Sequence, residues 1–205
     1  MRLNEVQTDA LTEVVNIGVG RAAASLSQLI DERIKLSVPN IKMCNLAELT
    51  EHIRGGQERL DTLVAQDFSG VTNGRSLLGF TRSSSIKLAQ ILAGCTDEMD
   101  ELDSDLCGIL EEVGNIVLNA VLGSFANMMG TSLNYTVPVL HTEASIESLI
   151  TGRLPSSDTD DECILIADAH FEVARLQIDG SLVIAFELDG IDVVLSRVIN
   201  AASTA

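Results

Sequence analysis

Aromatic side chains are almost absent from this sequence. They make up 3% of its 205 residues, with one tyrosine and no tryptophan, whereas hydrophobic residues as a whole reach 46%. The core must therefore be built from aliphatic side chains, and recognition of nucleic acids by stacking on exposed bases is disfavoured. A chain of this length can form one well-buried domain, or two fused halves that share one core.

Positive charge is scarce as well. The chain has 13 lysines and arginines against 30 aspartates and glutamates, a formal charge of −17, and only Lys35, Lys42 and Lys87 are lysines. Nucleic acids and anionic membrane surfaces bind to basic patches, so both are disfavoured, and a protein partner with a cationic face is favoured. A dense acidic surface is also typical of a high-salt cytoplasm, where salt screens the charges.

Metal-binding, membrane-spanning and secretory signals are missing too. The cysteines are scattered, with no C-x-x-C pair and no histidine at ligand spacing, which disfavours a zinc site or a disulfide framework. No apolar run reaches the ~18 residues that span a bilayer, and no signal peptide opens the chain. We therefore expect a cytoplasmic protein with reduced thiols and no metal of its own. The four cysteines are Cys44, Cys95, Cys107 and Cys163.

What the sequence does contain is an internal repeat. Twice, with an offset of 99 residues, a glutamate stands three residues before an asparagine, and a proline follows the asparagine after 23 residues. The first copy is Glu13, Asn16 and Pro39, and the second is Glu112, Asn115 and Pro138. A repeat of this kind shapes the fold and indicates how many sites to expect, which here is two.

Hydrophobic periodicity predicts the same order of elements in both halves. The first half is expected to contain a helix over 4–31, a strand over 34–43 limited to an edge or bulge by Pro39, a short helix over 46–53, strands over 61–68 and 75–80, and a helix over 83–92. The second half is expected to contain a helix over 104–129, a strand over 132–140, a short helix over 144–150, strands over 163–175 and 181–188, and a helix over 191–201. Asn73-Gly74 and Asp179-Gly180 carry the signal of hairpin turns.

These elements predict a mixed α/β (α+β) fold. We expect a single pseudo-two-fold domain over residues 1–205, formed by duplication of halves at about 1–100 and 101–205, with long helices packed on a largely antiparallel sheet. Phe80 and Phe186 fall at equivalent positions with an offset of 106, so the second half carries seven extra residues, which fit in the loop at 155–161. Gly18 and Gly20 lie mid-helix, where each costs up to ~1 kcal/mol, so close packing or a kink is expected there.

The repeated residues share one stripe of their helix. Asp9, Glu13 and Asn16 lie within about 60° of one another on a helical wheel, and the second helix repeats the stripe with Gly108 in the first position. A carboxylate can pair with a partner's lysine or arginine, and an amide can hold a water in line for attack. In phosphoryl transfer, such positioning supplies much of the catalysis. The simpler interpretation of a single copy is a solvated helix face, and duplication alone can also preserve the spacing.

At these residues the chain resembles the CheC/CheX/FliY phosphatases. Asp9-x3-Glu13-x2-Asn16-x22-Pro39 matches the family motif D/S-x3-E-x2-N-x22-P, and the second copy matches it except at Gly108. The paired motifs, the length and the order of elements resemble CheC most closely.

The resemblance implies a chemotaxis signal-termination phosphatase that hydrolyses the aspartyl phosphate of the response regulator CheY. It implies that the two asparagines orient the hydrolytic water and the two glutamates pair with a lysine beside the phosphoaspartate, while Asp9, Pro39 and Pro138 support the motif. It also implies that Mg²⁺ is carried by CheY and that this chain binds no cofactor. Some family members bind CheD, so the alternative is a non-catalytic adaptor of the same fold that binds CheY or CheD.

Overall fold

The computed structural model describes residues 4–31, 33–38, 41–55, 60–94, 100–151, 163–173, 176–186 and 196–197. Helices and strands are mixed along the chain, which confirms the predicted α/β class. In order, the elements are α1 (Glu5–Ile30), β1 (Ile34–Ser37), β2 (Ile41–Cys44), α2 (Leu46–Gly55), β3 (Thr62–Gly70), β4 (Gly74–Phe80), α3 (Arg82–Ala93), α4 (Ser104–Met128), β5 (Leu133–Tyr135), β6 (Val139–His141), α5 (Ile146–Thr151), β7 (Cys163–Val173) and β8 (Leu176–Phe186).

All eight strands belong to one curled antiparallel sheet. Its order is β1-β7-β8-β4-β3-β5, with β2 also paired to β7 and β6 also paired to β3. The long hairpins β3-β4 and β7-β8 meet in the middle of the sheet through the pairing of β4 with β8. The short strands lie at the two edges.

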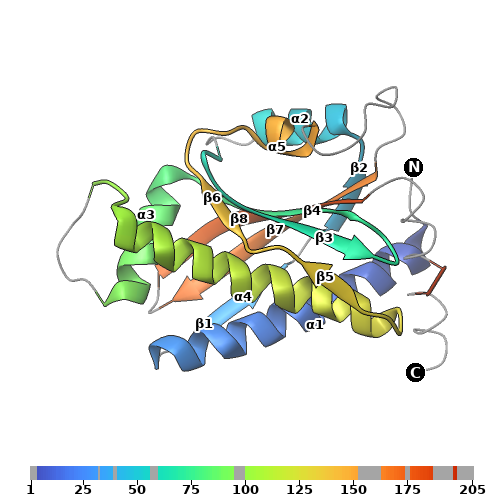
Figure 1. Ribbon diagram of the computed structural model, residues 1–205, viewed down its shortest axis with the longest axis horizontal. Coiled ribbons are helices and arrows are strands. Elements are labelled where there is room, and N and C mark those ends of the chain that lie inside the picture. Colours follow the sequence, from blue (N-terminus) through green and yellow to red (C-terminus); the bar gives the residue numbers. More distant parts are fainter. Residues whose placement is uncertain are drawn as a thin grey trace.

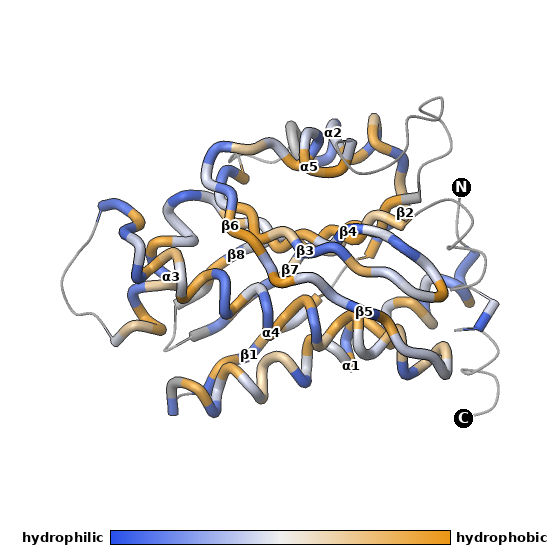
Figure 2. The backbone as a smooth tube through the Cα atoms, viewed as in Figure 1, coloured by the Kyte–Doolittle hydropathy of each residue, from blue (hydrophilic) through white to orange (hydrophobic). Residues whose placement is uncertain are grey.

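Helices cover both faces of the sheet (Figure 1). The pair α1 and α4 lies on one face and the short helices α2 and α5 on the other. Adjacent strand residues point to opposite faces, so Leu78 joins the cluster under α1 and α4 whereas Leu77 joins the cluster under α2 and α5. The strands at the centre are mainly apolar and the covering helices alternate between polar and apolar stretches (Figure 2). The fold therefore has two apolar cores separated by the sheet.

Side-chain caps fix where the two long helices begin. The Asn4 side chain accepts a hydrogen bond from Gln7 N at 2.9 Å, and the Gln7 side chain accepts one from Asn4 N at 2.9 Å. This reciprocal capping box satisfies two backbone donors at the start of α1. At the start of α4, Asp103 Oδ1 accepts from Leu106 N at 2.9 Å. Both helices thus begin directly after a polar capping residue.

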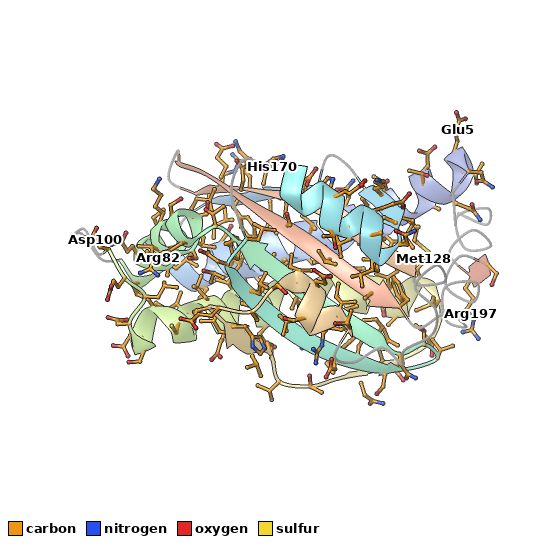
Figure 3. The ribbon with its side chains drawn as sticks, turned by 90° about the horizontal axis from the view of Figure 1, so that it is seen from above. Glu5, Arg82, Asp100, Met128, His170 and Arg197 are labelled. Atoms are coloured by element: carbon orange, nitrogen blue, oxygen red, sulfur yellow. The ribbon has the colours of Figure 1, made fainter. Side chains whose placement is uncertain are left out.

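The helices α1 and α4 lie side by side and run in opposite directions. Glu5, in the first turn of α1, and Met128, at the end of α4, lie towards one end of the molecule, while Asp100, just before α4, lies at the other (Figures 1 and 3). A Cβ atom on Gly18 would lie 2.5 Å from Val121 Cα, so only glycine permits this close approach. The predicted role of Gly18 is confirmed. Gly20 differs, because a Cβ there would meet no atom within 4 Å.

The long strands predicted over 34–43 and 132–140 are each broken into two short ones. Between β5 and β6, Pro138 is buried and has no backbone N–H to continue a ladder. The corresponding break between β1 and β2 contains Pro39, which lies outside the described residues. The prediction of one continuous strand over 132–140 is therefore wrong, and the expected effect of Pro39 lies outside the described residues.

The predicted hairpin turn at Asp179-Gly180 is wrong. Both residues lie inside β8, and they pair with Ala169 and His170 of β7, so the β7-β8 hairpin does not turn at residues 179–180. A Cβ on Gly180 would lie 2.8 Å from the ring of Phe80, so this glycine makes room for a ring and does not form a turn. The predicted loop at 155–161 lies outside the described residues, as does the helix at 191–201 apart from residues 196–197.

The register of the central strands agrees with the sequence offset between the halves. The pairing of β4 with β8 joins Gly74 to Phe186 and Phe80 to Gly180, and it is centred on Leu77 opposite Val183. These central residues are 106 positions apart, the offset expected from Phe80 and Phe186. The duplication itself stays a prediction from the sequence.

By length and composition, α4 is apolar enough to cross a membrane. Leu110, Val117, Leu118 and Phe125 on this helix are all buried, and α4 packs against α1 and the sheet. At its C-terminal end, Arg197 Nη1 donates to the carbonyl of Met129 at 3.0 Å, and Figure 3 shows Arg197 beside Met128. This helix therefore packs in the core of the fold.

The contact at Gly18 predicts opposite effects for two neighbouring glycines. Gly18→Ala is expected to destabilise the protein by roughly 1–3 kcal/mol, because its methyl group overpacks the helix contact. Gly20→Ala is the matched control and is expected to stabilise it by up to ~1 kcal/mol through helix propensity alone. Urea denaturation followed by circular dichroism measures both free energies of unfolding. Equal shifts for the two variants would show that α1 and α4 do not meet at Gly18.

Candidate functional site

The first predicted stripe lies on the exposed face of α1. Asp9, Glu13 and Asn16 are exposed, whereas Leu11 and Val14 on the other side of the helix are fully buried. None of the three stripe side chains has a hydrogen-bond or ion-pair partner among the described residues. Glu13 and Asn16 lie about one turn apart on the helix, so the carboxylate and the amide are available together to an incoming molecule.

The second stripe lies on α4 and is partly enclosed. Gly108 and Glu112 are exposed, but Asn115 is half-buried. A Cβ on Gly108 would meet nothing within 4 Å, so the missing side chain leaves open space on the stripe. Asn115 Nδ2 lies 3.5 Å from Glu112 Oε2, at the long limit of a hydrogen bond. The two predicted residues of this copy are therefore neighbours in space as well as in sequence.

A chain of amides connects the second stripe to the sheet. Gln66, on β3, donates from Nε2 to Asn119 Oδ1 at 2.9 Å, and Asn119 Nδ2 donates to Asn115 Oδ1 at 2.6 Å. The same Gln66 nitrogen donates to the carbonyl of Thr136 at 2.9 Å. Because Asn115 accepts a hydrogen bond on its oxygen, its remaining donor group is free to face Glu112 or a bound molecule.

The segment that contains Pro138 is tied to both α4 and β3. Leu140 N donates to Glu111 Oε1 at 3.1 Å, which joins β6 to α4. Thr136 N donates to the carbonyl of Asp67 at 3.0 Å, which joins the same segment to β3. Pro138 is buried here, while its neighbour Val137 is 82% exposed. The proline is therefore not part of the exposed surface of the second stripe.

The two stripes do not merge into one site. Glu13 and Asn16 precede the Gly18 contact on α1, and the second pair precedes the Val121 contact on α4. Because the helices are antiparallel, the pairs lie on opposite sides of that contact. Arg21 Nη1 lies 3.4 Å from Ser124 Oγ and links the helices next to it. The arrangement gives two separate Glu-Asn surfaces on one helix layer.

Two clefts formed by described residues contain no residue of either stripe. A cleft of about 650 Å³ between β1, β7 and β8 is lined by Lys35, His170 and Asp179 among others, and contains no stripe residue. A second cleft of about 270 Å³ is lined by Asp61, Arg82 and neighbouring residues. Small ligands bind in concave sites, whereas an open helix face suits a macromolecular partner.

The part of the chain that the structure describes contains no set of metal-ligating side chains. No group of three or more His, Cys, Asp or Glu side chains there is arranged to hold an ion. Near the second stripe, burial raises the pKa of the Cys107 thiol, and the carboxylates of Glu111 and Asp103 raise it further. Burial also raises the pKa of Tyr135. Both groups therefore stay protonated at neutral pH.

Two residues of this region were not identified from the sequence. Asn119 follows Asn115 by one helical turn, and this spacing was the available signal. Gln66 is a polar residue of β3 that is only 1% exposed. Its contact with α4 spans 53 residues of sequence, so local patterns do not predict it.

Comparison with known proteins identifies relatives in bacterial chemotaxis. Residues 6–43, which include most of α1, all of β1 and most of β2, match the model of the CheC-like family. The CheY-P phosphatase CheC of Bacillus subtilis is 22% identical over 177 residues, which cover 85% of each chain. The flagellar motor switch phosphatase FliY of the same bacterium is 22% identical over 98% of this chain, and the present chain spans about half of FliY, 51% of its length.

Solved structures share the fold along nearly the whole chain. FliY of Thermotoga maritima superposes with a TM-score of 0.78 at 18% identity, covering 98% of this chain and 100% of that one. The middle domain of FliM from H. pylori superposes with a TM-score of 0.66 at 11% identity, covering 95% of this chain and 99% of that one. The match to the CheC-like model, the two curated relatives and the shared fold together support a CheC/CheX/FliY family protein.

Proposed function

We propose that this chain is a chemotaxis signal-termination phosphatase that hydrolyses the aspartyl phosphate of the response regulator CheY. The observation that carries the proposal is the presentation of a carboxylate and an amide, side by side and twice, on the outer helix layer of a fold shared with named phosphatases. In this scheme Glu13, Asn16, Glu112 and Asn115 are the catalytic residues.

In this reaction the chain positions the attacking water and forms no covalent bond to the phosphoryl group. The amide of Asn16 or Asn115 holds a water in line with the aspartyl phosphate. The water oxygen forms a bond to phosphorus as the bond to the aspartyl oxygen breaks, and the water proton passes to the released phosphate. The aspartate leaves as a carboxylate, so no intermediate forms on this protein.

The two glutamates dock the response regulator. Glu13 and Glu112 are exposed one turn before their asparagines, so a lysine beside the phosphoaspartate pairs with the carboxylate and brings the phosphoryl group to the amide. The net charge of −17 favours a cationic partner surface in the same way. We propose that Mg²⁺ belongs to CheY and that the protein works in the cytoplasm.

The second candidate function is a non-catalytic adaptor that binds CheY or CheD. Two observations favour it. The fold is shared with the middle domain of FliM, which also occurs in a FliG–FliM complex, and the second stripe has Gly108 where the first has Asp9. An adaptor binds the regulator and regulates by sequestration, without accelerating the loss of phosphate.

Loss of both amides separates these functions. The double variant Asn16→Ala with Asn115→Ala is expected to reduce phosphate release from phosphorylated CheY to the spontaneous rate, because the water is no longer oriented. Binding to CheY held in its activated form by beryllofluoride is expected to persist, because both glutamates remain. A fluorescent phosphate sensor measures the first property and calorimetry the second.

Asn127→Ala is the matched control, since Asn127 is an exposed asparagine on the same helix α4 but off the stripe. It should keep the wild-type rate. A fully active double variant would contradict the role of the amides, and a wild-type protein that binds without accelerating phosphate loss would establish the adaptor.

Loss of the two carboxylate charges tests docking. Glu13→Gln with Glu112→Gln is expected to raise KM for phosphorylated CheY by roughly tenfold or more, since a hydrogen bond to a charged group contributes ~1.5–3 kcal/mol. The change in kcat is expected to be small because both amides remain, and the difference from wild type should shrink at high salt.

Glu51→Gln serves as the charge-matched control, because Glu51 is exposed on α2 across the sheet from α1 and α4. An equal rise in KM for Glu51→Gln would show that the effect comes from net charge alone. It would contradict the docking role of Glu13 and Glu112.

A further inference from the structure

Asn119 is a polar side chain next to the second stripe that the proposed chemistry does not use. Its Nδ2 donates to Asn115 Oδ1 at 2.6 Å, and its Oδ1 accepts from Gln66 Nε2 at 2.9 Å. Both ends of the Asn119 amide are thus engaged. A rotation of this side chain would break both hydrogen bonds at once. Its orientation is therefore fixed by Gln66 on strand β3.

The anchor of this chain of amides is buried. Gln66 is 1% exposed, and its Nε2 also donates to the carbonyl of Thr136 at 2.9 Å. Its Oε1 is buried and accepts no hydrogen bond from any described residue. An unpaired buried acceptor costs ~1–3 kcal/mol, and a sequence that keeps such a cost usually does so at a functional or strained site.

The first stripe has no equivalent support. The residue one turn after Asn16 is Gly20, and no atom lies within 4 Å of the position its Cβ would take. In the sheet, Gln66 pairs with Ser76. The residue 106 positions after Ser76 is Leu182, which pairs with the apolar Ala167. Neither α1 nor the strand at the equivalent position therefore offers an amide to Asn16.

We propose that Asn119 is a positioning residue that orients the Asn115 amide through Gln66, and that the second site therefore turns over faster per bound regulator than the first. The inference rests on the proposed function. The hydrogen bond from Asn119 occupies one lone pair of Asn115 Oδ1 and directs Asn115 Nδ2 outward, with the second lone pair left for the water. An amide held before the regulator binds loses less entropy when the water is placed.

The test isolates each site in turn. In an Asn16→Ala background only the second site is active, and Asn119→Ala is expected to lower kcat for phosphorylated CheY about tenfold with little change in KM. In an Asn115→Ala background only the first site remains, and the same substitution is expected to leave kcat unchanged. Asn127→Ala in both backgrounds controls for removal of an amide from α4. An equal loss in both backgrounds, or none in either, would overturn the inference.

A second variant preserves packing. Asn119→Asp keeps the shape and the oxygen that accepts from Gln66, but it replaces the donor that faces Asn115 with an oxygen. It is expected to lower kcat of the second site at least as much as Asn119→Ala. Wild-type kcat for the aspartate variant would contradict the inference, because the hydrogen bond to Asn115 is lost while the fold is kept.

A readout without turnover separates this inference from the proposed function. The side-chain NH₂ signal of Asn115, assigned by its loss in Asn115→Ala, is expected to have a high ¹⁵N order parameter in the wild type, because the hydrogen bond to its oxygen holds the amide in one orientation. In Asn119→Ala this order parameter is expected to fall. If the Asn16→Ala, Asn115→Ala protein keeps its activity, the proposed function fails, and the order parameter then decides the inference: an unchanged value for Asn115 in Asn119→Ala would overturn the positioning role.

Discussion

The close approach of α1 to α4 determines where everything of functional interest lies. Because Gly18 has no side chain, the backbones of the two helices meet at Val121. This contact sets the helices antiparallel on one face of the sheet, with their apolar sides in a shared core. The polar stripes are then left on the outside, one on each side of the contact. A bulkier residue at the crossing would change the spacing of both stripes at once.

The two Glu-Asn surfaces share a pattern but differ in their surroundings. The first has an extra carboxylate, Asp9, and is fully open to solvent. The second has lost that carboxylate at Gly108 but is connected to the sheet through Asn119 and Gln66. The first surface thus carries more negative charge for docking, whereas the asparagine of the second surface is held in a fixed orientation. Two copies of a motif on one core can therefore diverge, since each lies against different strands.

Local patterns in the sequence predicted most of the fold, and long-range contacts account for the failures. Helix periodicity located α1 and α4, because this signal acts within a few residues. Asp179-Gly180 was misassigned as a turn, because the glycine is required by the ring of Phe80, a hundred residues away in sequence. The stripe residues followed from spacing alone. Gln66 could not be found in this way, because its role depends on which helix packs over β3.

The broken strands at the two edges of the sheet have a consequence for solubility in crowded conditions. In the described part of the sheet, each edge carries two short strands, β1 and β2 along β7 and β5 and β6 along β3. A continuous outer strand would offer a row of free backbone donors and acceptors to a second molecule. The interruption at Pro138 limits that row to a few residues, although Val137 and Val139 are exposed there. Pro138 thereby protects this edge of the sheet against edge-to-edge aggregation.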